Sequence, residues 1–104
     1  MLEPGTTVWR YQVRNGRYLI EEGTVSLFGD RYRVAFTDGG MTTGGPRKED
    51  IGVVRTHGPI LWLLERDDEK ARRLIIEYEE RTIAELEQAI ANKRKILEMF
   101  GVKS

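Results

Sequence analysis

Few residues in this sequence could carry out catalysis. Cysteine is absent and His57 is the one histidine, which excludes thiol chemistry, disulfides and metal sites built from several Cys or His side chains. His57 could act as a general base, but it stands in a Thr-His-Gly-Pro sequence that predicts a solvated turn. Adjacent carboxylates such as Glu21 and Glu22 point to opposite faces of a strand, so they do not form an acid–base pair. We therefore predict a protein that is not an enzyme and uses no cofactor or metal.

A glycine-rich segment from Gly40 to Lys48 is the second candidate for chemistry. It has the glycines of a phosphate-binding loop, but Pro46 stands where that loop needs a lysine, and no predicted helix follows it. We interpret the segment as an exposed, flexible binding loop that is too polar to pack, with a passive connector as the alternative. Its candidate contact residues are Gly40, Met41, Thr42, Thr43, Arg47 and Lys48.

A two-residue turn at Asn15-Gly16 organises the first part of the chain. Both residues tolerate a positive φ, and the flanking residues alternate between apolar and polar, which predicts a type I′ hairpin. Its register sets Val13 opposite Tyr18 and Tyr11 opposite Ile20. Apolar side chains therefore share one face, which we expect to point into a core.

A second turn at Gly29-Asp30 predicts another hairpin, from residues 24–28 to 31–37. Its register sets Val25 opposite Val34, and Gly23 before it marks a bend or bulge. Short apolar runs at 51–54 and 60–64 suggest two further strands. We expect one core from Trp9, Tyr11, Val13, Tyr18, Ile20, Val25, Leu27, Tyr32, Val34, Phe36, Ile51 and Trp62.

Five short, bent antiparallel strands predict an α+β protein whose residues 1–65 form a small SH3-like β-barrel. The spacing in Glu22–Val25, Tyr32–Gly39 and Glu49–Ile51 is similar to the strand pattern of Tudor-type members of that fold. Those families bind methylated side chains, peptides or nucleic acid. The chain has no recognisable aromatic cage, so the resemblance implies the fold and no particular ligand.

A second resemblance lies where the predicted barrel ends. Leu61–Leu64 is rich in bulky apolar residues and leads directly into the acidic, alanine-containing start of a helix, Glu65–Ala71. This arrangement resembles short uncharacterised phage-encoded proteins. The resemblance implies an accessory protein of a mobile element, such as an inhibitor directed at the host.

Arginines dominate the face opposite the predicted core. Seventeen Lys and Arg residues balance seventeen Asp and Glu residues, so attraction to an anion has to come from a local patch. Arg14 directly opposite Arg17 is a repulsive pair unless an anionic group lies beside it. We predict that this face binds an acidic protein surface, nucleic acid or a nucleotide, with a solvated surface as the alternative. Its candidate residues are Arg10, Arg14, Arg17, Phe28, Arg31 and Arg33.

Residues 66–104 form the second predicted unit, a long amphipathic helix. From Asp67 to Phe100 there is no Gly or Pro, Asp67 suits the N-cap and Gly101 suits the C′ position, so we predict a helix over 68–100. At about 1.5 Å per residue it would be roughly 50 Å long and would overhang its barrel. A capping-box sequence that begins at Thr82 leaves open a break at that point.

An apolar stripe follows the whole predicted helix and defines a candidate oligomer interface. Covering its distal half requires a partner helix, which predicts a homo-oligomer, in the simplest case a dimer; a chain that folds back at Thr82 is the alternative. Glu79 and Lys93 lie in the same seam, so an antiparallel pairing would bring unlike charges together. The stripe consists of Ile76, Ile83, Leu86, Ile90, Leu97 and Phe100.

These patterns predict a non-enzymatic protein-interaction module that oligomerises through its C-terminal helix. The alternative is a nucleic-acid or nucleotide-binding protein that uses the arginines and the glycine-rich loop. The first thirty residues do not resemble a signal peptide, and the longest apolar run, residues 60–64, is far below the roughly 20 residues that span a bilayer. We expect no membrane partner and a cytoplasmic location, in the bacterial host if the protein is phage-encoded.

Overall fold

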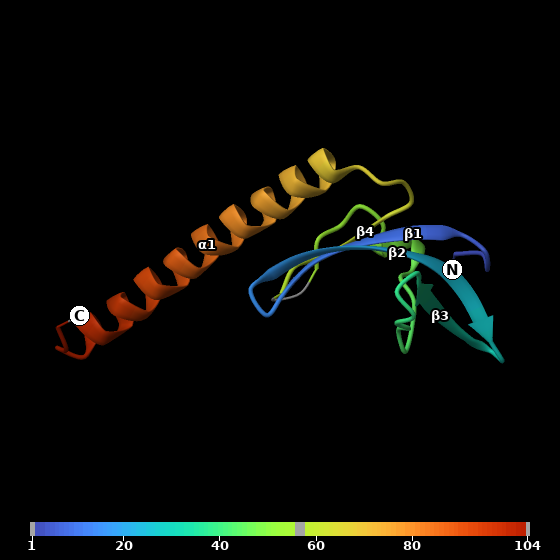
Figure 1. Ribbon diagram of the computed structural model, residues 1–104. Helices are drawn as coiled ribbons and strands as arrows, with labels where there is room; N and C mark the ends of the chain where they lie inside the picture. Colours follow the sequence, from blue (N-terminus) through green and yellow to red (C-terminus); the bar gives the residue numbers. More distant parts are fainter. Residues whose placement is uncertain (1, 56–57, 104) are drawn as a thin grey trace.

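A computed structural model describes residues 2–55 and 58–103 and combines one β-sheet with one long C-terminal helix (Figure 1). The predicted α+β class with a long C-terminal helix is thereby confirmed. The sheet is antiparallel and has the strand order β3-β2-β1-β4. Its strands are β1 (Thr7–Arg14), β2 (Arg17–Phe28), β3 (Arg31–Phe36) and β4 (Ile60–Leu63), followed by helix α1 (Asp68–Met99).

Both predicted hairpins form in the expected registers. Asn15 and Gly16 adopt φ values of 52° and 71°, and the strands around them pair Val13 with Tyr18. In the second hairpin Val25 pairs with Val34. The local turn residues therefore determine the pairing of the first three strands.

The sheet has four strands and is not closed into a barrel, so the predicted five-stranded SH3-like barrel is not found in the described residues. The expected strand at 51–54 is reduced to an isolated parallel bridge between Ile51 and Trp62. Gly52 explains the difference. Its φ of 78° turns the chain directly after Ile51, which an extended strand cannot accommodate.

Gly23 determines which residues share a face of the sheet. β2 continues through Gly23 without a bulge, and this residue pairs with Val8 on one side and Phe36 on the other. Because successive side chains in a strand point to opposite faces, Ile20 and Val25 lie on opposite faces of the sheet. The prediction that both hairpins contribute to one core is wrong.

Instead, the sheet has a core on each face. The helix-side core contains the buried residues Tyr11, Leu61, Leu63 and Ala71, with Trp9, Ile20, Val54, Leu74 and Ile75 packed against them. The loop-side core contains Leu2, Val8, Val25, Val34 and Phe36, with Tyr32, Ile51 and Trp62 packed against them. Tyr18 and Leu27, which we expected in the core, are 47% and 49% exposed. They lie near the ends of the two hairpins, outside the parts of the sheet that the two cores occupy.

Helix α1 begins and ends close to the predicted positions. The side chain of its N-cap, Asp67, accepts a hydrogen bond from the Lys70 backbone N–H, and Gly101 follows the helix with a φ of 77°. The helix is continuous through Thr82, whose hydroxyl donates to the Tyr78 carbonyl oxygen at 2.9 Å. That bond occupies the Thr82 hydroxyl within the helix, so it does not cap a new one.

The helix extends well beyond the sheet (Figure 1). The molecule measures 60 × 31 × 24 Å and has a radius of gyration of 18.5 Å. A compact domain of this length would have a radius of gyration of about 13 Å. All described residues from 83 to 103 are exposed, which confirms the predicted overhang.

Gly23 offers a test of the two-sided sheet. A Cβ atom at this position would lie 2.4 Å from Val34 Cγ1 and 3.0 Å from Phe36 Cδ1, whereas one at Gly44 would meet nothing within 4 Å. We expect Gly23→Ala to lower the free energy of unfolding by about 1–3 kcal/mol through overpacking. The matched control Gly44→Ala should change it by less than about 1 kcal/mol. Equal denaturant midpoints for the two variants would contradict the close packing at Gly23.

Candidate functional site

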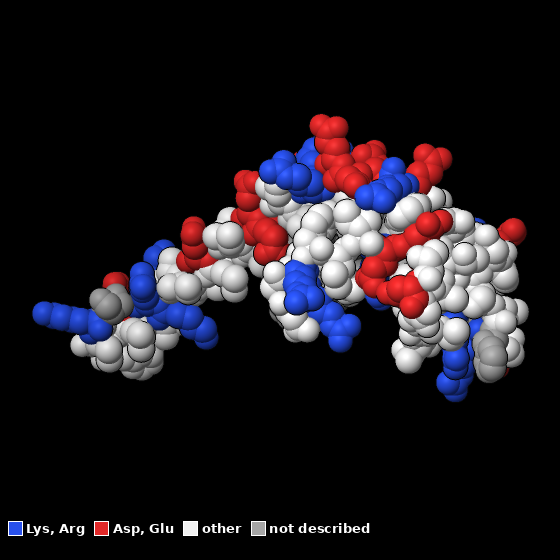
Figure 2. All heavy atoms as spheres, in the orientation of Figure 1, with Lys and Arg blue, Asp and Glu red and all other residues white. Residues whose placement is uncertain are grey.

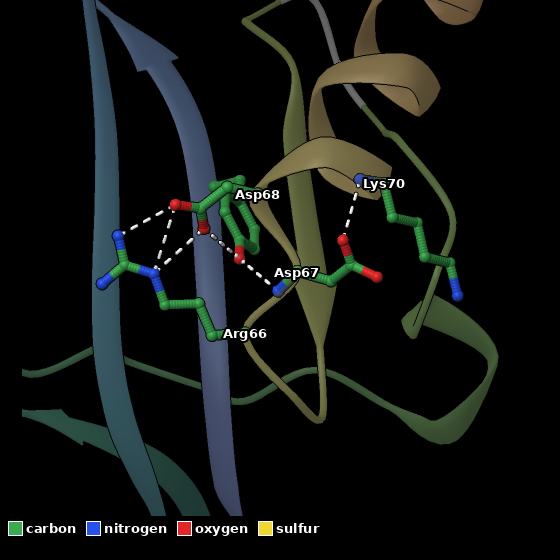
Figure 3. A network of polar contacts seen from close by, with 5 residues as sticks. Arg66, Asp67, Asp68 and Lys70 are labelled. Atoms are coloured by element: carbon green, nitrogen blue, oxygen red, sulfur yellow. Dashed lines mark hydrogen bonds and ion pairs between the residues drawn. The ribbon is translucent and has the colours of Figure 1, made fainter.

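A polar network attaches α1 to the sheet. The side chain of Tyr11 is fully buried, yet its hydroxyl donates to Asp68 Oδ1 at 2.9 Å and accepts from the Asp67 backbone N–H at 2.9 Å. Arg66 donates from Nε and Nη2 to the same Asp68 carboxylate, as Figure 3 shows. The first turn of the helix is thus held to β1 by a satisfied set of hydrogen bonds.

The protonation states in this network follow from those contacts. Hydrogen bonds from Arg66 and Tyr11 lower the pKa of the Asp68 carboxyl. Burial raises the pKa of the Tyr11 hydroxyl, assisted by its bond to Asp68 and opposed by the bond from the Asp67 backbone N–H. At neutral pH the tyrosine is therefore protonated and the aspartate ionised. The network holds the helix in place and is not poised to transfer a proton.

The glycine-rich segment packs against the sheet. The Thr42 backbone N–H donates to the Val34 carbonyl oxygen at 3.0 Å, and the Val34 N–H donates to Thr42 Oγ1 at 2.9 Å. Pro46 is buried. These contacts cover the outer edge of β3, so the expectation that this segment is too polar to pack is wrong. Its expected exposure is confirmed for Gly40, Met41, Thr43, Arg47 and Lys48.

A hollow of about 320 Å³ lies between this segment and β4. Thr42 and Thr43 of the predicted binding loop line it, while Gly40, Met41, Arg47 and Lys48 are not part of its lining. Sequence reasoning missed its other side, because Ile60 and Trp62 of β4 read as ordinary core residues. The lining comprises Thr42, Thr43, Gly44, Gly45, Pro46, Asp50, Val53, Arg55, Ile60 and Trp62.

Asp50 is the carboxylate in that hollow, and it is already paired. Its Oδ2 accepts from the Arg47 backbone N–H at 2.9 Å, and its Oδ1 lies 2.9 Å from Arg55 Nε. The hydrogen bond from Arg47 and the charges of both arginines lower the pKa of Asp50. Asp50 thus stays ionised and internally neutralised, which suits a structural role rather than general acid catalysis.

Arg10, one of the candidate binding arginines, belongs to the interior. Its guanidinium donates from Nε and Nη2 to the two Glu21 carboxylate oxygens, at 2.9 and 3.0 Å. It also lies 4.2 Å from the centre of the Phe36 ring. Arg10 therefore covers the loop-side core rather than offering its charge to a ligand.

The remaining arginines do not share one face. Arg14 and Arg17 pair with each other at the tip of the β1–β2 hairpin, on the loop side of the sheet. Arg31 and Arg33 belong to β3 and pair with residues 28 and 26, positions of the opposite parity along β2. The continuous strand at Gly23 separates the two pairs, so the predicted single arginine face is wrong. The prediction for the Phe28 side chain lies outside what the structure describes.

The apolar stripe of α1 is distinct from the side that contacts the sheet. Ala71 is buried, and Leu74 and Ile75 pack against the helix-side core, whereas Ile76 is 39% exposed. Steps of seven residues from Ile76 lead to Ile83, Ile90 and Leu97, which are 53%, 50% and 44% exposed, and Phe100 at the end of the helix is 80% exposed. All six residues predicted for the oligomer interface are exposed: Ile76, Ile83, Leu86, Ile90, Leu97 and Phe100.

Known proteins offer no guide to these surfaces. No family model, curated protein or solved structure matches the chain. In the described ranges, no three His, Cys, Asp or Glu side chains are grouped as a metal site requires, and no helix has the length and apolar character to cross a membrane. The prediction for His57 lies outside the described residues.

The pKa of Asp68 generates a prediction about acid stability. A carboxyl whose pKa is lowered by folding stabilises the protein above its unfolded value of about 3.9, and that stabilisation is lost as the pH falls through the lowered folded value. Asp68→Asn removes the titrating group. We therefore expect denaturant titrations between about pH 5 and pH 2 to show a shallower loss of stability for this variant than for the unchanged protein. Parallel curves would mean that the network contributes nothing to acid unfolding.

Proposed function

We propose that this chain is a non-enzymatic protein-interaction module that assembles with a second copy of itself through the apolar stripe of α1. The observation that carries the proposal is the exposure of the whole stripe, from Ile76 to Phe100, on a helix that extends beyond its own sheet. The attachment of α1 to the sheet leaves this side of the helix open, since Leu74 and Ile75 take up the contact.

Energetics favours covering the stripe. Burying a large aliphatic or aromatic side chain contributes roughly 1.5–3 kcal/mol relative to leaving it in water. Helices in proteins also gain most of their stability from the packing of an amphipathic face. A partner helix satisfies both requirements along the distal half of α1. A second copy of the chain is a suitable partner because its α1 has an apolar stripe of the same length.

In this proposal the helices form the assembly and the sheet of each copy stays available to bind a further protein. The hollow beside Trp62 is its candidate contact for a further protein, because it combines an apolar floor with the charged pair Asp50 and Arg55 at its rim. A role as an accessory protein of a mobile element stays a prediction from the resemblance of residues 61–71.

Two pairs of substitutions test the proposed assembly. Ile83→Asp with Ile90→Asp places charge in the stripe, whereas Ala84→Asp with Ala91→Asp places the same charge one residue further along, about 100° around the helix. We expect the first variant to sediment as a monomer and the second to keep the mass of the unsubstituted protein. Circular dichroism verifies that both are folded.

The alanine pair controls for the effect of added charge on helix stability. A folded stripe variant that keeps the wild-type mass would exclude the stripe as the interface. A wild-type chain that is monomeric at high concentration would do the same.

A second candidate function rests on Arg14 and Arg17. They pair directly across β1 and β2, and both are exposed at the hairpin tip. Like charges in this position repel each other, and a phosphate or an acidic side chain beside them would relieve the repulsion. We propose binding of nucleic acid or a nucleotide here as the alternative function, with an acidic protein surface as the competing ligand.

The hairpin-tip arginines predict salt-sensitive binding. We expect Arg14→Glu with Arg17→Glu to abolish binding to single- or double-stranded oligonucleotides or nucleotides at low salt, and binding by the unchanged protein to weaken steeply as salt is added. Arg31→Glu with Arg33→Glu alters β3, beside the far end of β2, and tests whether those arginines form a separate site. Absence of binding by the wild type, or unchanged binding after the hairpin-tip substitutions, would leave this surface merely solvated.

A further inference from the structure

The exposed part of α1 has an uneven charge distribution. Its first portion is acidic, and its last portion is basic, as the blue side chains at the C-terminal end of the helix in Figure 2 show. The acidic portion contains Glu77, Glu79, Glu80, Glu85 and Glu87 against Arg81, and the basic portion contains Lys93, Arg94 and Lys95 against Glu98. Two such helices attract each other along their length only when they run in opposite directions.

The positions of these charges select a register. Glu79 and Lys93 each lie seven residues from Leu86, one before it and one after it. An antiparallel pair centred near Leu86 therefore brings Glu79 close to Lys93 of the partner subunit, and the reverse. A parallel pair would place Glu79 beside Glu79 of the partner subunit in the apolar seam, where like charges are costly.

A second observation concerns the side of α1 that contacts the sheet. Eighteen residues make five helical turns, so Tyr78 and Ile96 lie on the same side, as do Thr82 and Phe100. Tyr78 and Thr82 are half-buried, and Tyr78 lies beside Val53 and Val54 of its own chain. Ile96 and Phe100 continue that side beyond the sheet and are exposed. The apolar surface of the distal helix is therefore wider than a two-helix seam requires.

We infer that two copies of this chain pair antiparallel through α1, centred near Leu86, and that the sheet of each copy covers Ile96 and Phe100 of the other. This inference rests on the proposed self-assembly and adds its direction and the contact with the partner's sheet. In such a pair the two-fold axis passes between the two helices, perpendicular to both, and keeps both sheets on the same side of the helix pair.

The register makes this contact possible. Residues 71–78, which contain the contacts of α1 with its own sheet and with Val53 and Val54, lie between eight and fifteen positions before Leu86, and residues 94–101 lie the same number of positions after it. The corresponding segment of the partner subunit therefore runs beside residues 94–101. A parallel pair would place both sheets at one end and leave Ile96 and Phe100 in water.

Cross-linking tests the direction, because the full chain contains no native cysteine. Glu79→Cys and Lys93→Cys chains are purified separately, mixed, and treated with a short bismaleimide. We expect the mixture to form a covalent dimer of one chain of each kind, while each variant alone yields little. Ala84→Cys, on the far side of the helix, is the control and should not cross-link.

Each outcome separates the two proposals. Efficient cross-linking of Glu79→Cys chains to one another, with a dimeric mass in solution, would overturn the antiparallel direction and leave self-assembly standing. A monomeric mass for the cysteine-free chain, or a dimer without either cross-link, would overturn the inference, and the monomeric mass would overturn self-assembly as well.

The contact with the partner's sheet has its own readout. Phe100→Ala and Ile96→Ala should each raise the dimer dissociation constant by roughly tenfold or more, since a tenfold change corresponds to about 1.4 kcal/mol. Glu98→Ala is the control, because Glu98 is exposed and follows the buried Ala71 by 27 residues, about seven and a half turns, which places it on the opposite side of α1. Equal dissociation constants for all three variants would show that the partner's sheet does not reach Ile96 and Phe100.

Discussion

The buried hydroxyl of Tyr11 is the point on which the arrangement of this molecule depends. It joins the middle of β1 to the first turn of α1 through Asp67 and Asp68, and it leaves no polar group of the tyrosine unsatisfied in the helix-side core. Arg66 fixes the same carboxylate from the other side. Because the helix is held at its first turn and then continues unbroken, the direction of that single turn sets where the entire distal half lies.

Local sequence signals predicted much of this fold, and the assignment of side chains to faces failed where it depended on contacts between residues far apart in the sequence. Asn15-Gly16 and the cap at Asp67 act over three or four residues, and both hold in the structure. The strand continuing through Gly23 could not be distinguished from a bulge, because that choice depends on Val34 and Phe36 packing against the missing Cβ. The conformation at Gly23 alone decides which face the side chains of the second hairpin take relative to those of the first.

The candidate sites also divide into those that local spacing predicts and those that depend on contacts between distant residues. The helix stripe could be located from heptad spacing alone, because a helix that leaves its domain obeys only its own period. The arrangement of the arginines could not be predicted in this way. Arg10 bonds to Glu21 and lies over the Phe36 ring, while Arg31 and Arg33 follow the parity of β3. The hollow beside Trp62 gave no sequence signal, because a loop returning over β4 creates it.

Because α1 is unbroken, its number of residues sets both the position and the rotation of its far end. Each residue adds about 1.5 Å of length and 100° of rotation, so a change in the number of residues between Ala71 and Phe100 moves the far end and turns it at the same time. Insertions or deletions of seven residues would preserve the stripe, whereas a change of one or two would rotate its distal part away from its proximal part. A stripe that stays continuous from Ile76 to Leu97 therefore requires the length of α1 to change in steps of whole heptads, a requirement that the loops of the sheet do not have.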